Sequence, residues 1–221
     1  MSTSSPAGPP APHPASARPL GPEEFDRWYG GWDPLTPRTI GEFMHGFDRP
    51  WWIIGGWSLE AYSGIARPHE DMDISILSSD AEAFRLFLGE TWTPWNVDDG
   101  WFRPFDHRFT DVRPDSQVWV RRNAQSPWVL DVPFTPSTGG RWTNKRHLAH
   151  TEDLEDVTWV AEDGLRYARP EVTLMFKAAR AREKDRIDAR NILPLLDTSA
   201  KTWLRDTIAR MNPDHEWVTS L

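Results

Sequence analysis

The sequence predicts an α+β protein with a C-terminal helical subdomain, and two observations carry that prediction. Strand patterns recur between residues 51 and 168, whereas the stretch from Pro170 to about Met211 has helical periodicity with a break near Pro194. The 14 Trp and 10 Phe of the 221 residues supply enough apolar area for a sizeable core. We therefore expect a mixed domain over residues 23–168 and a helical subdomain over residues 169–221.

Before the mixed domain, residues 1–22 are rich in proline, alanine and serine and predict a disordered tail. Short helices are then expected over residues 22–28 and 37–47. The apolar run of residues 51–54 predicts a buried strand that ends at Gly55 and Gly56, and a helix over residues 57–62 should follow and end at Gly64.

Further along, polar and apolar residues alternate strictly over residues 71–76, which predicts a strand with one polar and one apolar face. A helix over residues 81–88 should end at Gly89. Strands are expected over residues 117–121 and 128–134 as one hairpin, and over residues 157–160 and 165–168 as another.

Composition excludes several classes of protein. The 33 acidic residues outnumber the 25 Lys and Arg, a net charge of −8, which argues against a nucleic-acid partner. The absence of cysteine excludes disulfides, thiolate nucleophiles and zinc–sulfur sites. Without a secretory signal or an apolar run of membrane-spanning length, the expected location is cytoplasmic with no membrane partner. The oligomeric state stays open.

Three short motifs suggest chemistry when they are taken together. A glycine pair at Gly55 and Gly56 between a strand and a helix lets a ligand approach the backbone, although an ordinary tight turn is the simpler interpretation. Asp71 and Asp73 project to one side of a strand, as Mg²⁺ ligands or as a solvated polar face. Asp131 lies within an apolar strand, where it is either functional or a satisfied structural residue.

These motifs resemble the nucleotidyltransferase superfamily, and more closely its small-molecule branch, the aminoglycoside and lincosamide nucleotidyltransferases. The resemblance spans about residues 37–197 and rests on a set of motifs that occur in the family's order: Gly55-Gly56-Trp57-Ser58, Arg67-x-His69-x-Asp71-x-Asp73, Asp131, Arg169-Pro170-Glu171, Phe176-Lys177-Ala178 and Arg182-x-Lys184-Asp185-x-x-Asp188. It implies a mixed sheet flanked by helices, of the polymerase-β type.

The resemblance also implies an activity. Asp71, Asp73 and Asp131 would be the catalytic residues and would together ligate two Mg²⁺ ions. Asp131 would serve as a metal ligand, as the general base or as both. The reaction would transfer a nucleoside monophosphate, AMP from ATP by default, to a hydroxyl of a small molecule such as an aminoglycoside or lincosamide antibiotic. Two alternatives stay open: a protein or RNA acceptor, as in toxin–antitoxin proteins, and a non-catalytic nucleotide-binding module.

Nucleotide binding is assigned to residues near these motifs. The glycine pair and Trp57 would contact the nucleotide, and Arg67 and His69 would meet phosphate oxygens or merely orient their loop. Lys177 and Lys184 lie seven residues apart, so one helical face would carry both toward the β- and γ-phosphates, unless Lys184 pairs with Asp188 instead. A further basic group could also bind phosphate, and it comprises Arg141, Lys145 and Arg146.

The acceptor pocket is harder to place from the sequence. An aromatic stretch could line it, and its tryptophans are Trp92, Trp95 and Trp101. Acidic residues in the same stretch could attract a cationic acceptor, and these are Asp98, Asp99 and Asp106. Asp111 is a second choice for the third carboxylate, but its surroundings indicate a loop.

Overall fold

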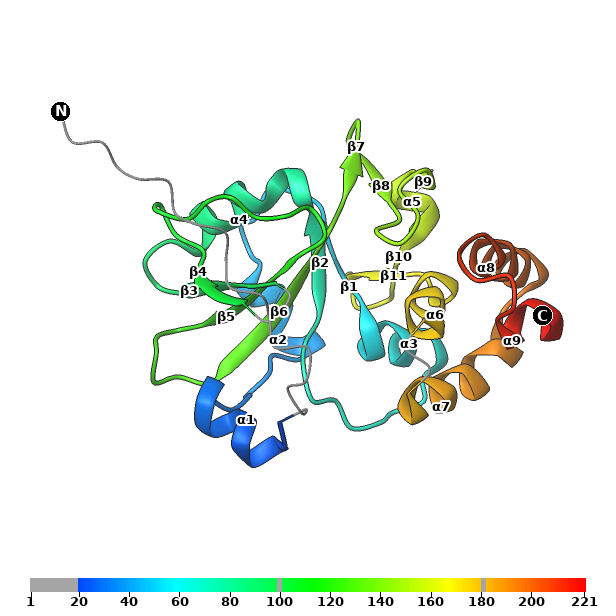
Figure 1. The fold of residues 1–221 in the computed structure, drawn as a ribbon, viewed down its shortest axis with the longest axis horizontal. Coiled ribbons are helices and arrows are strands. Elements are labelled where there is room, and N and C mark those ends of the chain that lie inside the picture. Colours follow the sequence, from blue (N-terminus) through cyan, green and yellow to red (C-terminus); the bar gives the residue numbers. More distant parts are fainter. Residues whose placement is uncertain (1–19, 99–100, 180–181) are drawn as a thin grey trace.

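The structure is a computed structural model that describes residues 20–98, 101–179 and 182–221. Its centre is an eight-stranded mixed sheet in the order β10-β11-β1-β2-β6-β5-β3-β4 (Figure 1). In chain order these strands are β1 (Trp51–Ile53), β2 (Ile74–Leu77), β3 (Thr93–Asp98), β4 (Trp101–Pro104), β5 (Gln117–Arg121), β6 (Trp128–Thr135), β10 (Thr158–Val160) and β11 (Arg166–Ala168). Strand β2 lies antiparallel to β1 and parallel to β6.

Helices flank this sheet. They are α1 (Pro22–Tyr29), α2 (Pro37–Phe43), α3 (Gly55–Ser63), α4 (Ala81–Leu88), α5 (Leu154–Val157), α6 (Pro170–Ala178), α7 (Glu183–Ile192), α8 (Thr198–Met211) and α9 (Glu216–Ser220), with short 3-10 turns at Ser78–Asp80 and Leu193–Leu195. No helix in the described part of the chain combines the length and the apolar character needed to cross a bilayer.

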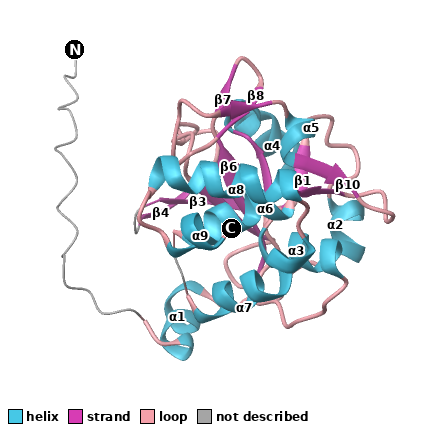
Figure 2. Cartoon of the chain, turned by 90° about the vertical axis from the view of Figure 1, so that its right-hand side faces the viewer, coloured by secondary structure: helices cyan, strands magenta, loops and turns pink. Residues whose placement is uncertain are grey.

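The two faces of the sheet have different roles, which strand β6 displays residue by residue. Leu130, Val132 and Phe134 are fully buried and pack in a core with α2 and α4. The side chains between them, among them Asp131, point to the opposite face. A second core joins Trp52 of β1 and α3 to helices α6 to α9, which stand in front of the strands in Figure 2.

Most of the predicted elements are confirmed. Helices α1 and α4 and the hairpins β5–β6 and β10–β11 form where the patterns place them. Helix α2 ends at Phe43, earlier than expected, and continues only as a turn. The fold class, a mixed sheet flanked by helices in an α+β arrangement, is confirmed as well.

Other predictions need correction. Helix α3 begins at Gly55 because the glycine pair itself forms the first turn. Strand β2 begins only at Ile74, and its residues are buried on both faces of the sheet. The one polar side chain in the strand, Ser75, is accommodated because its hydroxyl donates to the Pro133 carbonyl at 2.6 Å. The expected continuous helix after Pro170 is divided, with α6 ending at Ala178 and α7 beginning at Glu183.

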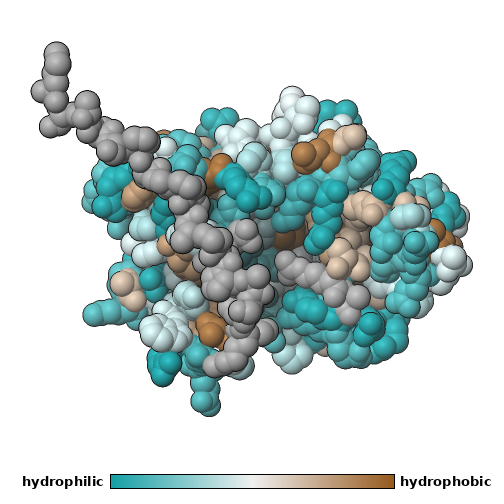
Figure 3. Space-filling model, in the orientation of Figure 1, coloured by the Kyte–Doolittle hydropathy of each residue, from teal (hydrophilic) through white to brown (hydrophobic). Residues whose placement is uncertain are grey.

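Two groups of strands in the structure were not predicted from the sequence. The β3–β4 hairpin was not expected, nor was a small three-stranded sheet made by β7 (Ser137–Thr138), β8 (Arg141–Thr143) and β9 (Thr151–Glu152). The predicted tail of residues 1–22 lies outside the described residues except for its last three positions. Hydrophilic residues dominate the face in Figure 3, in keeping with the net charge of −8.

Candidate active site

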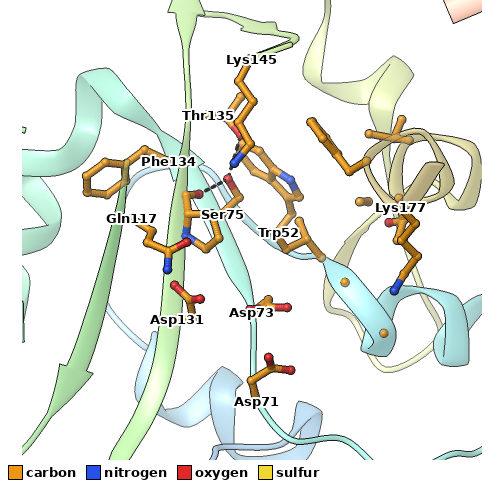
Figure 4. Close-up of a pocket in the computed structure, with 18 of the residues that line it drawn as sticks. Trp52, Asp71, Asp73, Ser75, Gln117, Asp131, Phe134, Thr135, Lys145 and Lys177 are labelled. Carbon is orange, nitrogen blue, oxygen red and sulfur yellow. Dashed lines mark hydrogen bonds between the residues drawn. The ribbon is translucent and has the colours of Figure 1, made fainter. Parts of the chain in front are cut away.

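A pocket of about 370 Å³ lies between the sheet and helices α3, α6 and α7. Its sheet side carries three aspartates, Asp71, Asp73 and Asp131, and Lys177 lies across the pocket from them on helix α6 (Figure 4). The basic residues that line it are Arg67, Lys145, Arg146, Lys177, Arg182 and Lys184. The pocket therefore has an acidic wall and a basic wall.

The acidic wall follows from strand geometry. Asp71 and Asp73 precede β2 and lie on one face, because side chains two residues apart in an extended chain point the same way. Met72 between them is fully buried in the core. Asp73 pairs with Asp131 of β6 in an isolated parallel bridge, and the Asp131 N–H donates to the Met72 carbonyl at 2.9 Å. Two adjacent strands thus bring three sequence-predicted aspartates to one place.

The environment of Asp131 strongly favours its neutral form. Burial raises the pKa of its carboxyl well above the usual range, and the negative charges of Asp73 and Asp71 raise it further. The Trp119 indole and the Lys145 ammonium offset the rise only in part. Its Oδ1 atom is buried and has no hydrogen-bond partner among the residues that the structure describes. A carboxylate in this position is stabilised by a cation or by a proton.

These residues fit a magnesium site by their chemistry. Carboxylate oxygens are the ligands that Mg²⁺ prefers, and the Oδ1 of Asp131 forms no hydrogen bond with the part of the chain that the structure describes. Within residues 20–98, 101–179 and 182–221, however, no three acidic or histidine side chains converge on one point as a formed metal site. The three aspartates line the same pocket.

The glycine pair is required by its neighbours. Gly55 has φ +69°, a left-handed conformation, and a Cβ there would lie 2.5 Å from the Asp73 Oδ2. At Gly56, a Cβ would overlap the Arg67 guanidinium and would lie 2.9 Å from the His69 Nδ1. The absence of side chains at both positions therefore makes room for Asp73 and for Arg67.

On the basic wall, the expectation of one shared helical face is wrong. Lys177 and Lys184 lie on separate helices, since α6 ends at Ala178 and α7 begins at Glu183. Lys184 pairs with Glu70 at 2.9 Å, so the alternative pair with Asp188 does not form. Asp188 instead lies 3.2 Å from the Arg67 Nε and 2.8 Å from the Lys177 Nζ.

Trp57 and His69, both assigned to the nucleotide, lie behind the pocket and are not among its lining residues. Their rings stack at 3.7 Å between centroids. The His69 Nε2 lies 2.8 Å from the Glu60 carboxylate, and the Trp57 indole N–H donates to the Asp71 carbonyl at 3.1 Å. They brace the segment that carries Asp71, which is the orienting role left open for His69. Arg67, in contrast, does line the pocket.

Of the further basic group that comprises Arg141, Lys145 and Arg146, only two members reach the pocket. Lys145 and Arg146 line the pocket, and each lies within 6 Å of the Phe176 ring, at 5.7 and 5.9 Å. Arg141 pairs with Asp153 at 2.8 Å and does not line it. A short loop therefore delivers only part of this group to the site.

The tryptophans suggested for the acceptor do not line the pocket that holds the aspartates. Trp92 packs on Phe43 with ring centroids 5.0 Å apart, Trp95 and Trp101 belong to β3 and β4, and none of the three lines the pocket. Nearby acidic groups are paired with arginines: Asp98 with Arg113 at 3.5 Å, Asp106 with Arg108 at 2.6 Å, and Asp111 with Arg103 at 3.2 Å. Asp99 lies outside the described residues.

Sequence reasoning also missed several residues that line the pocket. They are Trp52, Ser75, Gln117, Trp119, Thr135, Trp142, Thr173 and Phe176. Strand alternation could have found some of them, because Ser75 continues the face of Asp71 and Asp73, and Thr135 continues the face of Asp131. Gln117 and Trp119 required the β5–β6 register, in which Trp119 lies opposite Asp131.

The comparisons with known proteins agree with this geometry. A family model described as aminoglycoside-2''-adenylyltransferase matches residues 38–114, which include the glycine pair, Asp71 and Asp73. A solved structure of the antibiotic-resistance factor ANT(2'')-Ia is 12% identical with a TM-score of 0.52, covering 83% of this chain and 92% of that one. No curated protein matches.

A second solved structure is lincosamide antibiotic adenylyltransferase LnuA in its lincomycin-bound form, 16% identical with a TM-score of 0.50. The match covers 72% of this chain and 97% of that one. Identities this low show a shared fold, and together with the family match they support a nucleotidyltransferase enzyme. The chain thus has the fold of the polymerase-β-type nucleotidyltransferases, and it resembles the aminoglycoside and lincosamide adenylyltransferases.

Proposed function

We propose that the protein is a Mg²⁺-dependent enzyme that transfers AMP from ATP to a hydroxyl group of a small molecule. The observation that carries the proposal is the division of one pocket into an acidic wall of Asp71, Asp73 and Asp131 and a basic wall that includes Arg67 and Lys177. A nucleoside triphosphate with bound Mg²⁺ carries the complementary charges, because its phosphates suit the cations and its metal suits the carboxylates.

Asp71, Asp73 and Asp131 are the residues that would hold Mg²⁺, in a two-ion arrangement. When bound, the ions supply charge stabilisation to the attacking and leaving oxygens of the displacement. Each role is a proposal, and the two-ion count follows from the three carboxylates and the family resemblance. The repulsion among the three charges supports it, since a cation would relieve that repulsion.

Asp131 is also the proposed general base. The Asp131 carboxylate would accept the proton of the acceptor hydroxyl, through the oxygen that does not ligate Mg²⁺, as the new oxygen–phosphorus bond forms and the bond to pyrophosphate breaks. A carboxylate within hydrogen-bond reach of the reacting hydroxyl can serve as a general base. Asp131 lies beside Gln117 and Trp119, and this neutral part of the wall is the proposed place for the acceptor.

The basic wall would bind the triphosphate. Arg67, Lys177 and Arg182 line the same pocket as the start of helix α3, where the backbone N–H groups after Gly55 add to the attraction for phosphate. Lys184 contributes less, because Glu70 already neutralises it at the pocket edge. Trp57 and His69 would act only through the loop that they brace.

The solved relatives support a proposal for the acceptor class. The structure of LnuA contains lincomycin, and a structure of ANT(2'')-Ia contains adenylyl-2''-tobramycin. We extend this to the present chain as a small-molecule acceptor of the aminoglycoside or lincosamide type and as a role in antibiotic resistance. The division at residues 168 and 169 into a nucleotidyltransferase domain and a helical subdomain, and a cytoplasmic location, are proposed with it.

The test is pyrophosphate release from Mg-ATP across a panel of aminoglycosides and lincosamides, with Asp73→Asn alongside. Release with one compound class that is lost in the variant supports the proposal. Normal release from Asp73→Asn contradicts the metal role of this wall. Activity that depends on a macromolecular extract favours a protein or RNA acceptor, and Mg-ATP binding without turnover on any acceptor favours a non-catalytic module.

A further inference from the structure

Behind the basic wall lies a buried layer of carboxylates that does not line the pocket. Asp185 and Asp188 of helix α7 are 1% and 4% exposed. Asp185 lies 3.2 Å from the Lys177 Nζ and 2.8 Å from the Arg182 Nε, and Asp188 contacts Lys177 at 2.8 Å and Arg67 at 3.2 Å. Two anions thus hold three cations that face the pocket from three different segments of the chain.

Asp188 has a special place in this layer, because it connects the loop before β2 to helix α6. Arg67 comes from that loop and Lys177 from α6, and Asp188 binds each with one carboxylate oxygen. Lys177 is itself only 8% exposed, so a substitution at Asp188 would leave a nearly buried ammonium with one carboxylate instead of two.

The orientation of the Arg67 guanidinium is fixed on two sides. Its Nε faces Asp188 at 3.2 Å, and its Nη1 donates to the Pro68 carbonyl at 2.8 Å. The third nitrogen, Nη2, lies over Gly56 in the volume that a Cβ would fill. Arg67 and Gly56 both line the pocket, so Nη2 lies next to the first turn of helix α3 at the pocket wall.

We propose that Asp188 is a positioning residue that holds Arg67 and Lys177 in the geometry that binds the triphosphate of the nucleotide. The inference rests on the proposed function and deepens it. The proposal predicts the opposite of what net charge alone predicts, because Asp188 places a negative charge near the proposed phosphate site. If net charge alone mattered, removal of this carboxylate would strengthen phosphate binding; if position matters, removal weakens it.

Asp188→Asn provides the test because it keeps the size of the side chain and one acceptor oxygen while it removes the charge. We expect the dissociation constants of Mg-ATP and of inorganic tripolyphosphate to rise about tenfold or more, the effect of one lost charge-assisted contact. Asp188→Glu, which restores the carboxylate, should recover part of the loss. Glu183→Gln on the same helix is the matched control, since Glu183 is exposed and pairs only with Arg186 and Arg190 among the described residues.

Arg67→Lys provides a second test in case Asp188→Asn folds poorly, which melting and circular dichroism would reveal. Lysine keeps the charge but cannot bond Asp188 and Pro68 together, so it should bind tripolyphosphate nearly as weakly as Arg67→Ala. Unchanged or tighter binding by Asp188→Asn, or full binding by Arg67→Lys, overturns the positioning role while wild-type turnover keeps the proposed function. A wild-type protein that binds neither probe overturns both.

Discussion

At the scale of single residues, Asp131 carries two proposed roles, general base and Mg²⁺ ligand. The Asp131→Asn variant keeps the shape of the side chain but can neither accept a proton nor provide a charged ligand. We expect turnover to fall by about 10²–10⁴, the usual contribution of a general base, and more if a metal is also lost. Pyrophosphate release with a productive acceptor measures this. Asp111→Asn, at an exposed aspartate paired with Arg103, is the control and should retain activity.

Asp185 makes a prediction about pH. Burial works against its charged form, but hydrogen bonds from Arg182 and Lys177 outweigh burial and hold the pKa of Asp185 at about 2. Because this pKa lies below that of the unfolded chain, the carboxylate stabilises the fold above about pH 4, and the effect is lost as the pH falls through about 2. The free energy of unfolding therefore falls as the pH is lowered, as expected for an acid whose pKa is lowered by folding.

The Asp185→Asn variant should therefore lose about 2 kcal/mol of unfolding free energy at pH 7, the value of a shift of this size. The difference from wild type should shrink to about half by pH 3. Urea titrations at several pH values measure it. A deficit that is the same at pH 7 and pH 3 would show that lost packing, and not the ionised carboxylate, explains the effect.

The sequence predicted the residues of the acidic wall better than those of the basic wall, for a physical reason. Asp131 lies in strand β6, and Asp71 and Asp73 lie in the extended segment just before β2, where alternation fixes the side to which each side chain points. Lys177 and Lys184 were placed on one helix, and that placement failed at the break before α7. Whether a cation faces a phosphate or a neighbouring carboxylate depends on tertiary contacts that helical spacing does not contain.

At the scale of elements, the β1–α3 turn makes a prediction that separates strain from function. Gly55 and Gly64 have nearly the same left-handed φ, +69° and +70°. An alanine at either position should cost about 1–2 kcal/mol in stability through backbone strain. Only at Gly55 would the new Cβ meet Asp73, at 2.5 Å, whereas at Gly64 nothing lies within 4 Å.

Gly55→Ala should therefore abolish most of the Mg-ATP turnover, while Gly64→Ala loses stability but keeps its activity when assayed below its melting temperature. Thermal melts and pyrophosphate release on both variants provide the comparison. Equal activities for the two variants would mean that the contact between this turn and Asp73 has no part in the reaction.

Element prediction from the sequence succeeded where a local signal was strong. The hairpins β5–β6 and β10–β11 have apolar runs and polar loops of the expected kind. Strands β7, β8 and β9 are two or three residues long, too short for alternation to be visible. Strand β3 contains Pro94, which argues against a strand in the sequence although its carbonyl accepts from the Phe105 N–H in the fold.

At the scale of the whole molecule, two cores connect parts that the sequence separates. The proposed boundary at residue 168 follows a change from strands to helices, but the second core crosses that position: Trp52, Leu59 and Trp142 pack with residues of α6, α7, α8 and α9. The buried hydroxyls of Ser58 in α3 and Thr173 in α6 bond at 2.8 Å across the same boundary. Such contacts between distant segments are invisible to local sequence patterns.

A core shared in this way predicts that the sheet and the C-terminal helices unfold together. Leu204 of α8 is fully buried, so Leu204→Ala should cost about 2–5 kcal/mol. Because α8 packs through the shared core, tryptophan fluorescence, which reports mainly on the sheet, and far-ultraviolet circular dichroism, which reports mainly on helices, should shift in urea by the same amount. Two separate transitions, with only the helical signal shifted, would show instead that residues 169–221 form a subdomain with independent stability, and the pocket between sheet and helices would then be able to open without unfolding the sheet.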